Sequence, residues 1–170
     1  MRAGLAAVAA AALAGCQSIP ADAPSATASL QPTKGSSVSG KATFQQVGDK
    51  VHVVAVVSGL TPGEHGFHIH DVGDCSSGDG MSAKGHFNPV GKPHGHPGMD
   101  ERHAGDMPAL KADPYGNAAL ETDLDIVTVS PGPTSIVGRG LIVHADPDDY
   151  TTQPTGNAGA RLACAVIQRS

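Results

Sequence analysis

The sequence has no tryptophan, and only three phenylalanines and two tyrosines occur among its 170 residues. Aliphatic side chains and alanine must therefore fill most of any hydrophobic core. Charged residues make up only 16%, the formal net charge is −5 and no basic run occurs, which argues against a nucleic-acid partner. A chain of this length supports one domain with a real core and is too short for two.

A helical signal is also missing, because no segment keeps an apolar period of about 3.6 over ten or more residues. Glycine (22 residues) and proline (13 residues) are abundant, which suits short strands joined by turns. Strands are predicted at 41–46, 50–58, 65–70, 118–123, 126–130, 136–145 and 161–167. This pattern predicts an antiparallel sandwich or barrel.

No apolar run is long enough to span a bilayer. The apolar stretch 4–13 follows Arg2 and runs into Leu13-Ala14-Gly15-Cys16. Residues 1–16 thus resemble a bacterial lipoprotein signal, which is cut before a cysteine that is then acylated. We expect a protein outside the cytoplasm, in the periplasm or cell envelope, held to a membrane by lipid on Cys16. An ordinary secretion signal with an incidental cysteine is the alternative.

The rest of the chain divides into a linker and a domain. Residues 17–27 are rich in Pro, Ala and Ser and are predicted to be a flexible linker, so that 28–170 form the folded domain. The chain has only three cysteines. If Cys16 carries lipid, Cys75 and Cys164 remain as one pair, and an oxidising compartment favours a disulfide between them.

Residues 71–117 form a stretch without strand signals that is far longer than ordinary connections. Seven of the nine histidines lie between positions 65 and 103, most of them in this stretch. Just before it, strand alternation places Phe67 and Ile69 on one face and His68 and His70 on the other, where two imidazoles can share a metal.

The long stretch itself adds further candidate ligands, namely His86, His94, His96, His103 and Asp106. Imidazoles with a carboxylate suit a tetrahedral zinc site. A bound zinc would also supply the order that so long a loop otherwise lacks. The alternative is a polar, solvated, histidine-rich loop.

Five motifs in order, GFHIHDVGD, HFNP, ERHAGD, GRGLIVH and GNAGARLAC, resemble the Cu,Zn superoxide dismutase family over residues 38–167. The resemblance implies an all-β fold, an eight-stranded antiparallel Greek-key β-barrel or sandwich of immunoglobulin-like layout. It also implies a long metal-binding loop and a second active-site loop. Superoxide dismutase is itself a standard example of sandwich architecture.

The resemblance implies a role for each matching residue. The copper set is His68, His70, His86 and His144, and the zinc set is His86, His94, His103 and Asp106. His86 would bridge both metals, since an imidazole presents two opposed nitrogens. Asp148 would hydrogen-bond one ligand of each metal, Arg161 would bind the substrate anion, and Cys75 and Cys164 would form the disulfide.

The implied activity is the disproportionation of superoxide to oxygen and hydrogen peroxide, with copper cycling between Cu(II) and Cu(I) and zinc remaining Zn(II). The alternative is a lipoprotein that carries copper or zinc without turnover. A carrier needs neither the bridging His86 nor Arg161. A purely structural zinc domain is disfavoured because His68, His70 and His144 are all present.

Three histidines are expected to lie outside the metal sites: His52 on an exposed strand face, His65 in a structural role and His96 near the zinc set. The spacing of Cys75 after His70 is similar to that of bacterial relatives, whereas HFNP and GNAGARLAC resemble the eukaryotic type. A homodimer is therefore compatible with the sequence, but its geometry is left open. The stretch 145–160 has no lysine, so electrostatic steering would depend on Arg161 and the metals.

Overall fold

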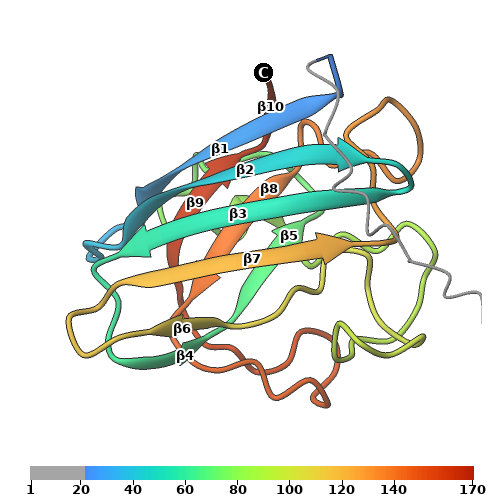
Figure 1. Cartoon of the computed structure of the whole chain (residues 1–170). Coiled ribbons are helices and arrows are strands. Elements are labelled where there is room, and N and C mark those ends of the chain that lie inside the picture. Colours follow the sequence, from blue (N-terminus) through green and yellow to red (C-terminus); the bar gives the residue numbers. More distant parts are fainter. Residues whose placement is uncertain (1–21) are drawn as a thin grey trace, which may run out of the picture.

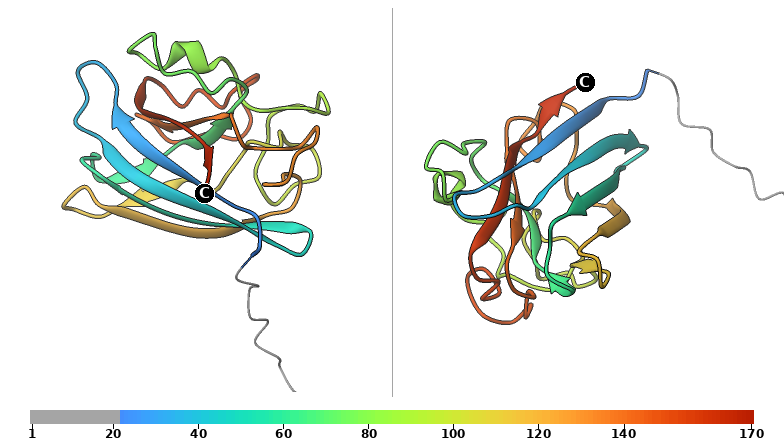
Figure 2. Two further views of the ribbon diagram at one scale, coloured as in Figure 1. Left: turned by 90° about the horizontal axis from the view of Figure 1, so that it is seen from above. Right: turned by 90° about the vertical axis from the view of Figure 1, so that its left-hand side faces the viewer.

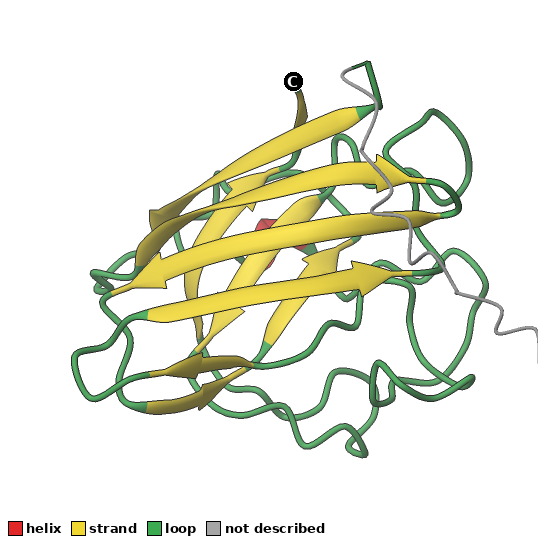
Figure 3. Cartoon of the chain, viewed as in Figure 1, coloured by secondary structure: helices red, strands yellow, loops and turns green. Residues whose placement is uncertain are grey.

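The computed structural model describes residues 22–170, so the predicted signal, Cys16 and residues 17–21 of the predicted linker lie outside the described residues. Regular structure in the described part is almost entirely β (Figure 3), apart from one 3₁₀ turn, η1 (Met81–Ala83). Within 22–170, no helix is long and apolar enough to cross a membrane.

The strands are β1 (Ser25–Pro32), β2 (Ser39–Val47), β3 (Lys50–Ser58), β4 (Gly63–His65), β5 (Phe67–His70), β6 (Leu110–Ala112), β7 (Ala118–Leu124), β8 (Gly140–His144), β9 (Arg161–Val166) and β10 (Gln168–Arg169). The main sheet has the order β5-β8-β9-β1-β2-β3-β7, with β10 also paired to β1, and β4 pairs with β6 in a small second sheet. All of these strand pairs are antiparallel.

The main sheet curls strongly, as the three views show (Figures 1 and 2). Its neighbours β3–β7, β5–β8 and β9–β1 are far apart in the chain, which is the mark of Greek-key crossovers. At one end β4 continues into β5 through the single residue Gly66, and β6 lies beside β7 (Figure 1). The strands therefore nearly close on themselves, and the predicted Greek-key β-barrel class is confirmed.

The core fills the inside of this curled sheet. In β3 every second residue is buried, from Val51 to Val57, while the residues between them face outward. Phe44 of β2 stands opposite Val53 in the register of the two strands and is equally buried. β3 is thus a half-buried strand whose residues point alternately into the core and outward.

Strands β5 and β8 differ from β3 because all of their residues are buried. Phe67, Ile69, Leu141 and Val143 belong to the main core, so the alternate residues of both strands point away from it. The chain that follows β5, residues 71–109, and the chain between β8 and β9 cover that outer side. Two neighbouring strands therefore present polar side chains to a sheltered layer between sheet and loops.

The long loop is ordered by backbone pairing to β5. Phe87 N–H donates to the Ile69 carbonyl at 2.8 Å, and Ile69 N–H donates to the Gly105 carbonyl at 3.0 Å. A Cβ at Gly105 would lie 2.2 Å from that same Ile69 carbonyl oxygen, so only glycine permits this approach. Two distant parts of the loop, around positions 86 and 105, are thereby placed against the strand of His68 and His70.

A disulfide between Cys75 and Cys164 fastens the start of the loop to β9, with their Cα atoms 5.9 Å apart. Cys164 packs with Ile142 and with Ala83 of η1 in a second, smaller apolar cluster. This cluster lies on the outer side of β8 and anchors the segment that carries η1.

One predicted strand, 126–130, is wrong. Val127 and Val129 are buried as expected, but the segment forms only an isolated bridge, Thr128 to Ser135. The side chain of Gln46 accepts hydrogen bonds from the Thr128 hydroxyl (2.8 Å) and the Val129 N–H (3.0 Å). These polar groups are satisfied by a side chain instead of a neighbouring strand.

Several predicted boundaries also differ. The predicted strand 136–145 is regular only in β8, and the predicted strand 65–70 divides at Gly66, where its two halves pair with different partners. β1 begins at Ser25, inside the segment 17–27 that was predicted as linker. Its inward residues are small or moderate in size, Ala26, Ala28 and Leu30, so the sequence carries only a weak strand signal there.

Candidate metal centre

The structure gathers the seven predicted metal ligands into two adjoining groups that share His86. One group is His68, His70, His86 and His144, and the other is His86, His94, His103 and Asp106. In each group one donor atom per residue lies within 4.8 Å of all the others, and every member is buried. β5 and β8 supply three of the histidines, and the long loop supplies the rest.

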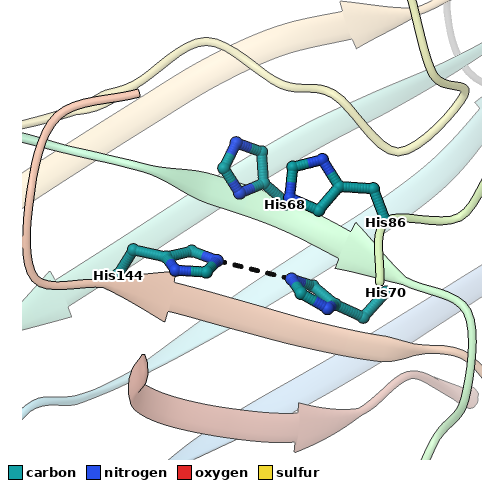
Figure 4. Close-up of side chains that lie close together, drawn as sticks. All are labelled: His68, His70, His86 and His144. Carbon is teal, nitrogen blue, oxygen red and sulfur yellow. Dashed lines mark hydrogen bonds between the residues drawn. The ribbon is translucent and has the colours of Figure 1, made fainter. Parts of the chain in front are cut away.

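In the first group four imidazoles converge from two strands and the loop (Figure 4). The Nε2 atoms of His70 and His144 lie 3.4 Å apart, facing one another across the β5–β8 pair. The rings of His68 and His86 stack, with their centroids 4.0 Å apart. Four imidazole nitrogen donors without a carboxylate among them suit copper.

Four buried ring nitrogens in the two groups have no hydrogen-bond partner: His68 Nδ1, His86 Nε2, His94 Nδ1 and His103 Nδ1. Buried polar atoms are rarely left unpaired in proteins. Here the unpaired atoms cluster at the two places where donor atoms converge. The residues therefore fit two metal ions, which would take up these lone pairs.

The opposite nitrogens of the first group are hydrogen-bonded outward. His68 Nε2 lies 2.6 Å from Asp148 Oδ2, and His70 Nδ1 lies 2.8 Å from the Lys84 carbonyl oxygen. Since carboxylates and carbonyls only accept, each of these nitrogens donates, and the inward nitrogen keeps its lone pair. This arrangement is what metal-binding histidines require.

In the second group the carboxylate of Asp106 is central. Its Oδ1 lies 2.8 Å from His86 Nδ1 and 3.4 Å from His103 Nδ1, and its Oδ2 lies 3.0 Å from His94 Nδ1. Three imidazole nitrogens and one carboxylate match a tetrahedral zinc site. His86 thus presents Nδ1 to this group and its unpaired Nε2 to the first group.

The electrostatics favour neutral imidazoles in the first group. Burial, reinforced by the neighbouring His68, lowers the pKa of His86 to about 3. Burial and the adjacent histidines also hold the pKa values of His70 and His144 well below the usual range. Burial alone would raise the pKa of Asp106, but the imidazoles of His103, His86 and His94 around the carboxylate lower it far more. Neutral imidazoles in the first group and an ionised Asp106 are the forms that bind metals. His94 differs, because burial alone would lower its pKa but the carboxylates of Asp106 and Asp148 raise it to about 9, so that it would release a proton on binding a metal.

Asp148, which lies in the loop after β8, connects the two groups. Its Oδ2 accepts from His68 Nε2 at 2.6 Å and its Oδ1 accepts from His94 Nε2 at 2.8 Å. Gly156 packs directly on this contact, since a Cβ there would lie 1.8 Å from Asp148 Oδ1. The carboxylate accepts a hydrogen bond from one imidazole in each group, which is the contact that the family resemblance implied.

We expect Asp148→Asn to weaken metal binding by about 10–100-fold. An amide can accept from one of the two imidazole N–H groups but turns its own N–H toward the other. The measurement is competition with a chromophoric chelator for zinc and for copper. Asp149→Asn is the control, because the carboxylate of Asp149 accepts hydrogen bonds only from Thr151 and Thr152 of its own loop. Unchanged affinity in Asp148→Asn would show that the carboxylate does not orient the ligands.

Arg161 begins β9 directly opposite His144. Its two terminal nitrogens donate to the carbonyls of Gly80 and Lys84, both at 2.6 Å. The guanidinium is half-buried and lines a pocket of about 300 Å³ together with His70 and His144. Its hydrogen bonds go to backbone carbonyls, and within residues 22–170 no carboxylate forms a salt bridge with it, although the charge of Asp79 acts on it from nearby.

The remaining histidines lie outside both groups. His65 is buried, and its ring nitrogens lie within hydrogen-bond distance of the carbonyl oxygens of Thr61 (2.8 Å) and His144 (2.9 Å). This structural role helps to position the backbone of His144. His52 is on the outer face of β3, 2.8 Å from Asp123. The ring of His96 packs edge-on against Tyr150, 4.7 Å between centroids.

Lys84 is a functional position that the sequence did not reveal. Its carbonyl oxygen accepts from both His70 Nδ1 and Arg161, and thereby connects a candidate metal ligand to the arginine that is expected to bind the anion. Its φ of 65° is rare for a residue other than glycine. Because the interaction uses the backbone, no side-chain pattern in the sequence could have indicated it.

Comparison with known proteins agrees with this geometry. Residues 38–167 match the family of copper/zinc superoxide dismutases (SODC). A crystal structure of the clock protein EA4 is 40% identical in sequence, with a TM-score of 0.78, and the match covers 86% of this chain and 94% of that one. The matched span contains both histidine groups, the disulfide and Arg161, and the chain therefore belongs to the copper/zinc superoxide dismutase family.

Proposed function

We propose that this protein is an active superoxide dismutase that binds copper and zinc and converts two superoxide anions and two protons into oxygen and hydrogen peroxide. The observation that carries the proposal is the pair of donor groups that share His86, one nitrogen facing each group. His68, His70, His86 and His144 would hold copper, and His86, His94, His103 and Asp106 would hold zinc.

When bound, copper supplies the one-electron redox chemistry that both half-reactions need, whereas zinc has none. Residues of the chain bind the superoxide anion and transfer protons. Arg161, always cationic, holds superoxide in the pocket beside His70 and His144. His86 Nε2, which has no hydrogen-bond partner, would accept a proton when no metal occupies it and give that proton to the peroxide anion formed from superoxide, while Nδ1 keeps its place beside Asp106.

The proposal is tested by loading purified protein with copper and zinc, measuring the metal content and assaying superoxide consumption on the same sample. An enzyme consumes superoxide in proportion to its copper content. A carrier without turnover would bind both metals and leave the decay of superoxide unaltered, and that result would refute the proposal.

Arg161→Ala should reduce kcat/KM for superoxide by about tenfold or more while the copper and zinc contents stay the same. The variant removes the positive charge that faces the pocket but none of the metal-binding atoms. Arg169→Ala in β10 is matched in net charge, and Arg169 donates to the Val129 carbonyl well away from the pocket residues. Equal kinetics in the two variants would contradict a role for Arg161 in anion capture.

We also propose that the enzyme is anchored to a bacterial membrane outside the cytoplasm through lipid on Cys16. The support is the sequence Leu13-Ala14-Gly15-Cys16 after a short apolar stretch. In a bacterial host, Cys16→Ser should move the protein from the membrane fraction to the soluble fraction, and Ser18→Ala should leave it at the membrane. Membrane association that persists in Cys16→Ser would overturn the anchor.

A further inference from the structure

An exposed methionine stands at the mouth of the pocket that holds Arg161. The pocket of about 300 Å³ is lined by His70, Met81, His144 and Arg161, together with residues from the loop between β8 and β9. Met81 is 58% exposed, and it is the only sulfur-containing residue among those that line the pocket. A large apolar side chain with this exposure at the entrance to a polar site calls for an explanation.

The position of Met81 is set by the same contacts that hold the arginine. The carbonyl just before it, on Gly80, and the carbonyl of Lys84 three residues after it both accept from the Arg161 guanidinium at 2.6 Å. The Met81 N–H itself donates to Asp79 Oδ1 at 2.9 Å. These hydrogen bonds hold η1 against Arg161, and they place its first residue, Met81, at the edge of the pocket.

We propose that Met81 is an oxidation site for the hydrogen peroxide formed at the copper group, and that it protects the neighbouring ligand imidazoles. The O–O bond of peroxide breaks, one oxygen atom forms the S=O bond of methionine sulfoxide, and the other leaves as water. Sulfur loses two electrons and peroxide gains them. The inference rests on the proposed function, which supplies the oxidant.

The chemistry favours a thioether in this place. Methionine sulfoxide is returned to methionine by reductases, so damage at Met81 is repairable. Damage to the imidazole of His70 or His144 would instead remove a metal donor. Because Met81 lies outside both donor groups, its oxidation leaves every metal-binding nitrogen and oxygen in place.

Met99 provides a matched control within the same chain. It is 55% exposed, nearly the same as Met81, but it lies in the zinc-side part of the long loop and does not line the pocket. Exposure alone therefore predicts equal oxidation of the two sulfurs. Met107 is fully buried and serves as the unreactive reference.

The experiment supplies superoxide to two preparations, one loaded with copper and zinc and one with zinc alone, with catalase present to remove peroxide from bulk solution. Sulfoxide in each peptide is then quantified by mass spectrometry. We expect the ratio of sulfoxide at Met81 to that at Met99 to be about one with zinc alone and at least about fivefold higher when copper is present. A ratio near one in the copper-loaded protein would overturn the inference.

A second variant tests protection. In Met81→Leu, peroxide should oxidise His70 or His144 and release copper at least about twice as fast as in the unaltered protein, and Met99→Leu should not change the rate. Unchanged copper retention in Met81→Leu would refute the protective role. Superoxide consumption is assayed separately on the same samples: if it is absent while the Met81 ratio rises with copper, the proposed function fails and copper-directed oxidation stands.

Discussion

Replacing His86 by alanine should lower superoxide consumption by more than about 100-fold, because catalysis depends on charges and donors that are already in place. The change removes one donor from each group at once, and it leaves Asp106 Oδ1 without its 2.8 Å partner. Copper and zinc would then bind as independent ions. The measurement is superoxide consumption together with the electron paramagnetic resonance spectrum of Cu(II), with and without zinc.

His96→Ala is the matched control for His86→Ala. His96 lies in the same loop, but it belongs to neither donor group and packs against Tyr150 instead. Its removal should leave both activity and the copper spectrum as they are. If the spectrum of His86→Ala still responded to zinc as the unaltered protein does, the bridge would be excluded.

Removing the disulfide is the second change from which we expect a large effect. Cys75 and Cys164 are separated by 89 residues, and closing so long a loop stabilises the folded state by about 4.5 kcal/mol in the chain-entropy model. For a domain of this size, that loss corresponds to a fall in Tm of about 9–18 °C. The measurement is urea and thermal unfolding of the double variant Cys75→Ser, Cys164→Ser.

The disulfide also bears on the active site, because the segment it fastens carries the Gly80 and Lys84 carbonyls that hold Arg161. We therefore expect the double variant to lose kcat/KM as well as stability. Unaltered protein treated with a thiol reductant should behave like the variant, which separates loss of the bond from effects of the serines. A change in unfolding free energy below about 1 kcal/mol in both would show that the covalent link is not what stabilises this loop.

Much of the fold was predictable because its signals are local. The valine-rich run of β3 predicts a strand, and the alternation of Phe67 and Ile69 with His68 and His70 in β5 shows directly which residues of β5 face the core. β1 and β6 escaped prediction for the opposite reason. β1 has mostly small inward side chains and β6 has only three residues, so neither carries a strong strand signal. β1 is a strand because it pairs with β2 and β9, and β6 because it pairs with β4.

The candidate site likewise has features that the sequence shows locally and features that depend on contacts between distant residues. The types of the ligands and the motifs that contain them could be read from the chain, since imidazole and carboxylate donors are themselves the chemistry of a copper and zinc site. The proposed anion-binding role of Arg161 was assigned from its motif, but the carbonyls that accept hydrogen bonds from it, on Gly80 and Lys84, could not be predicted.

By itself, then, the sequence determined the all-β class, the pair of cysteines and the set of residues available to bind metal. The unpaired ring nitrogens of His68, His86, His94 and His103, and the hydrogen bonds by which Asp148 connects the two groups, could be found only in the folded structure. The tertiary structure also decided that Met81 stands at the rim of the pocket. These features depend on contacts between distant residues, such as His68 and Asp148, which are 80 positions apart. No local periodicity records such contacts, because they exist only once the barrel has brought β5, β8 and the loops together.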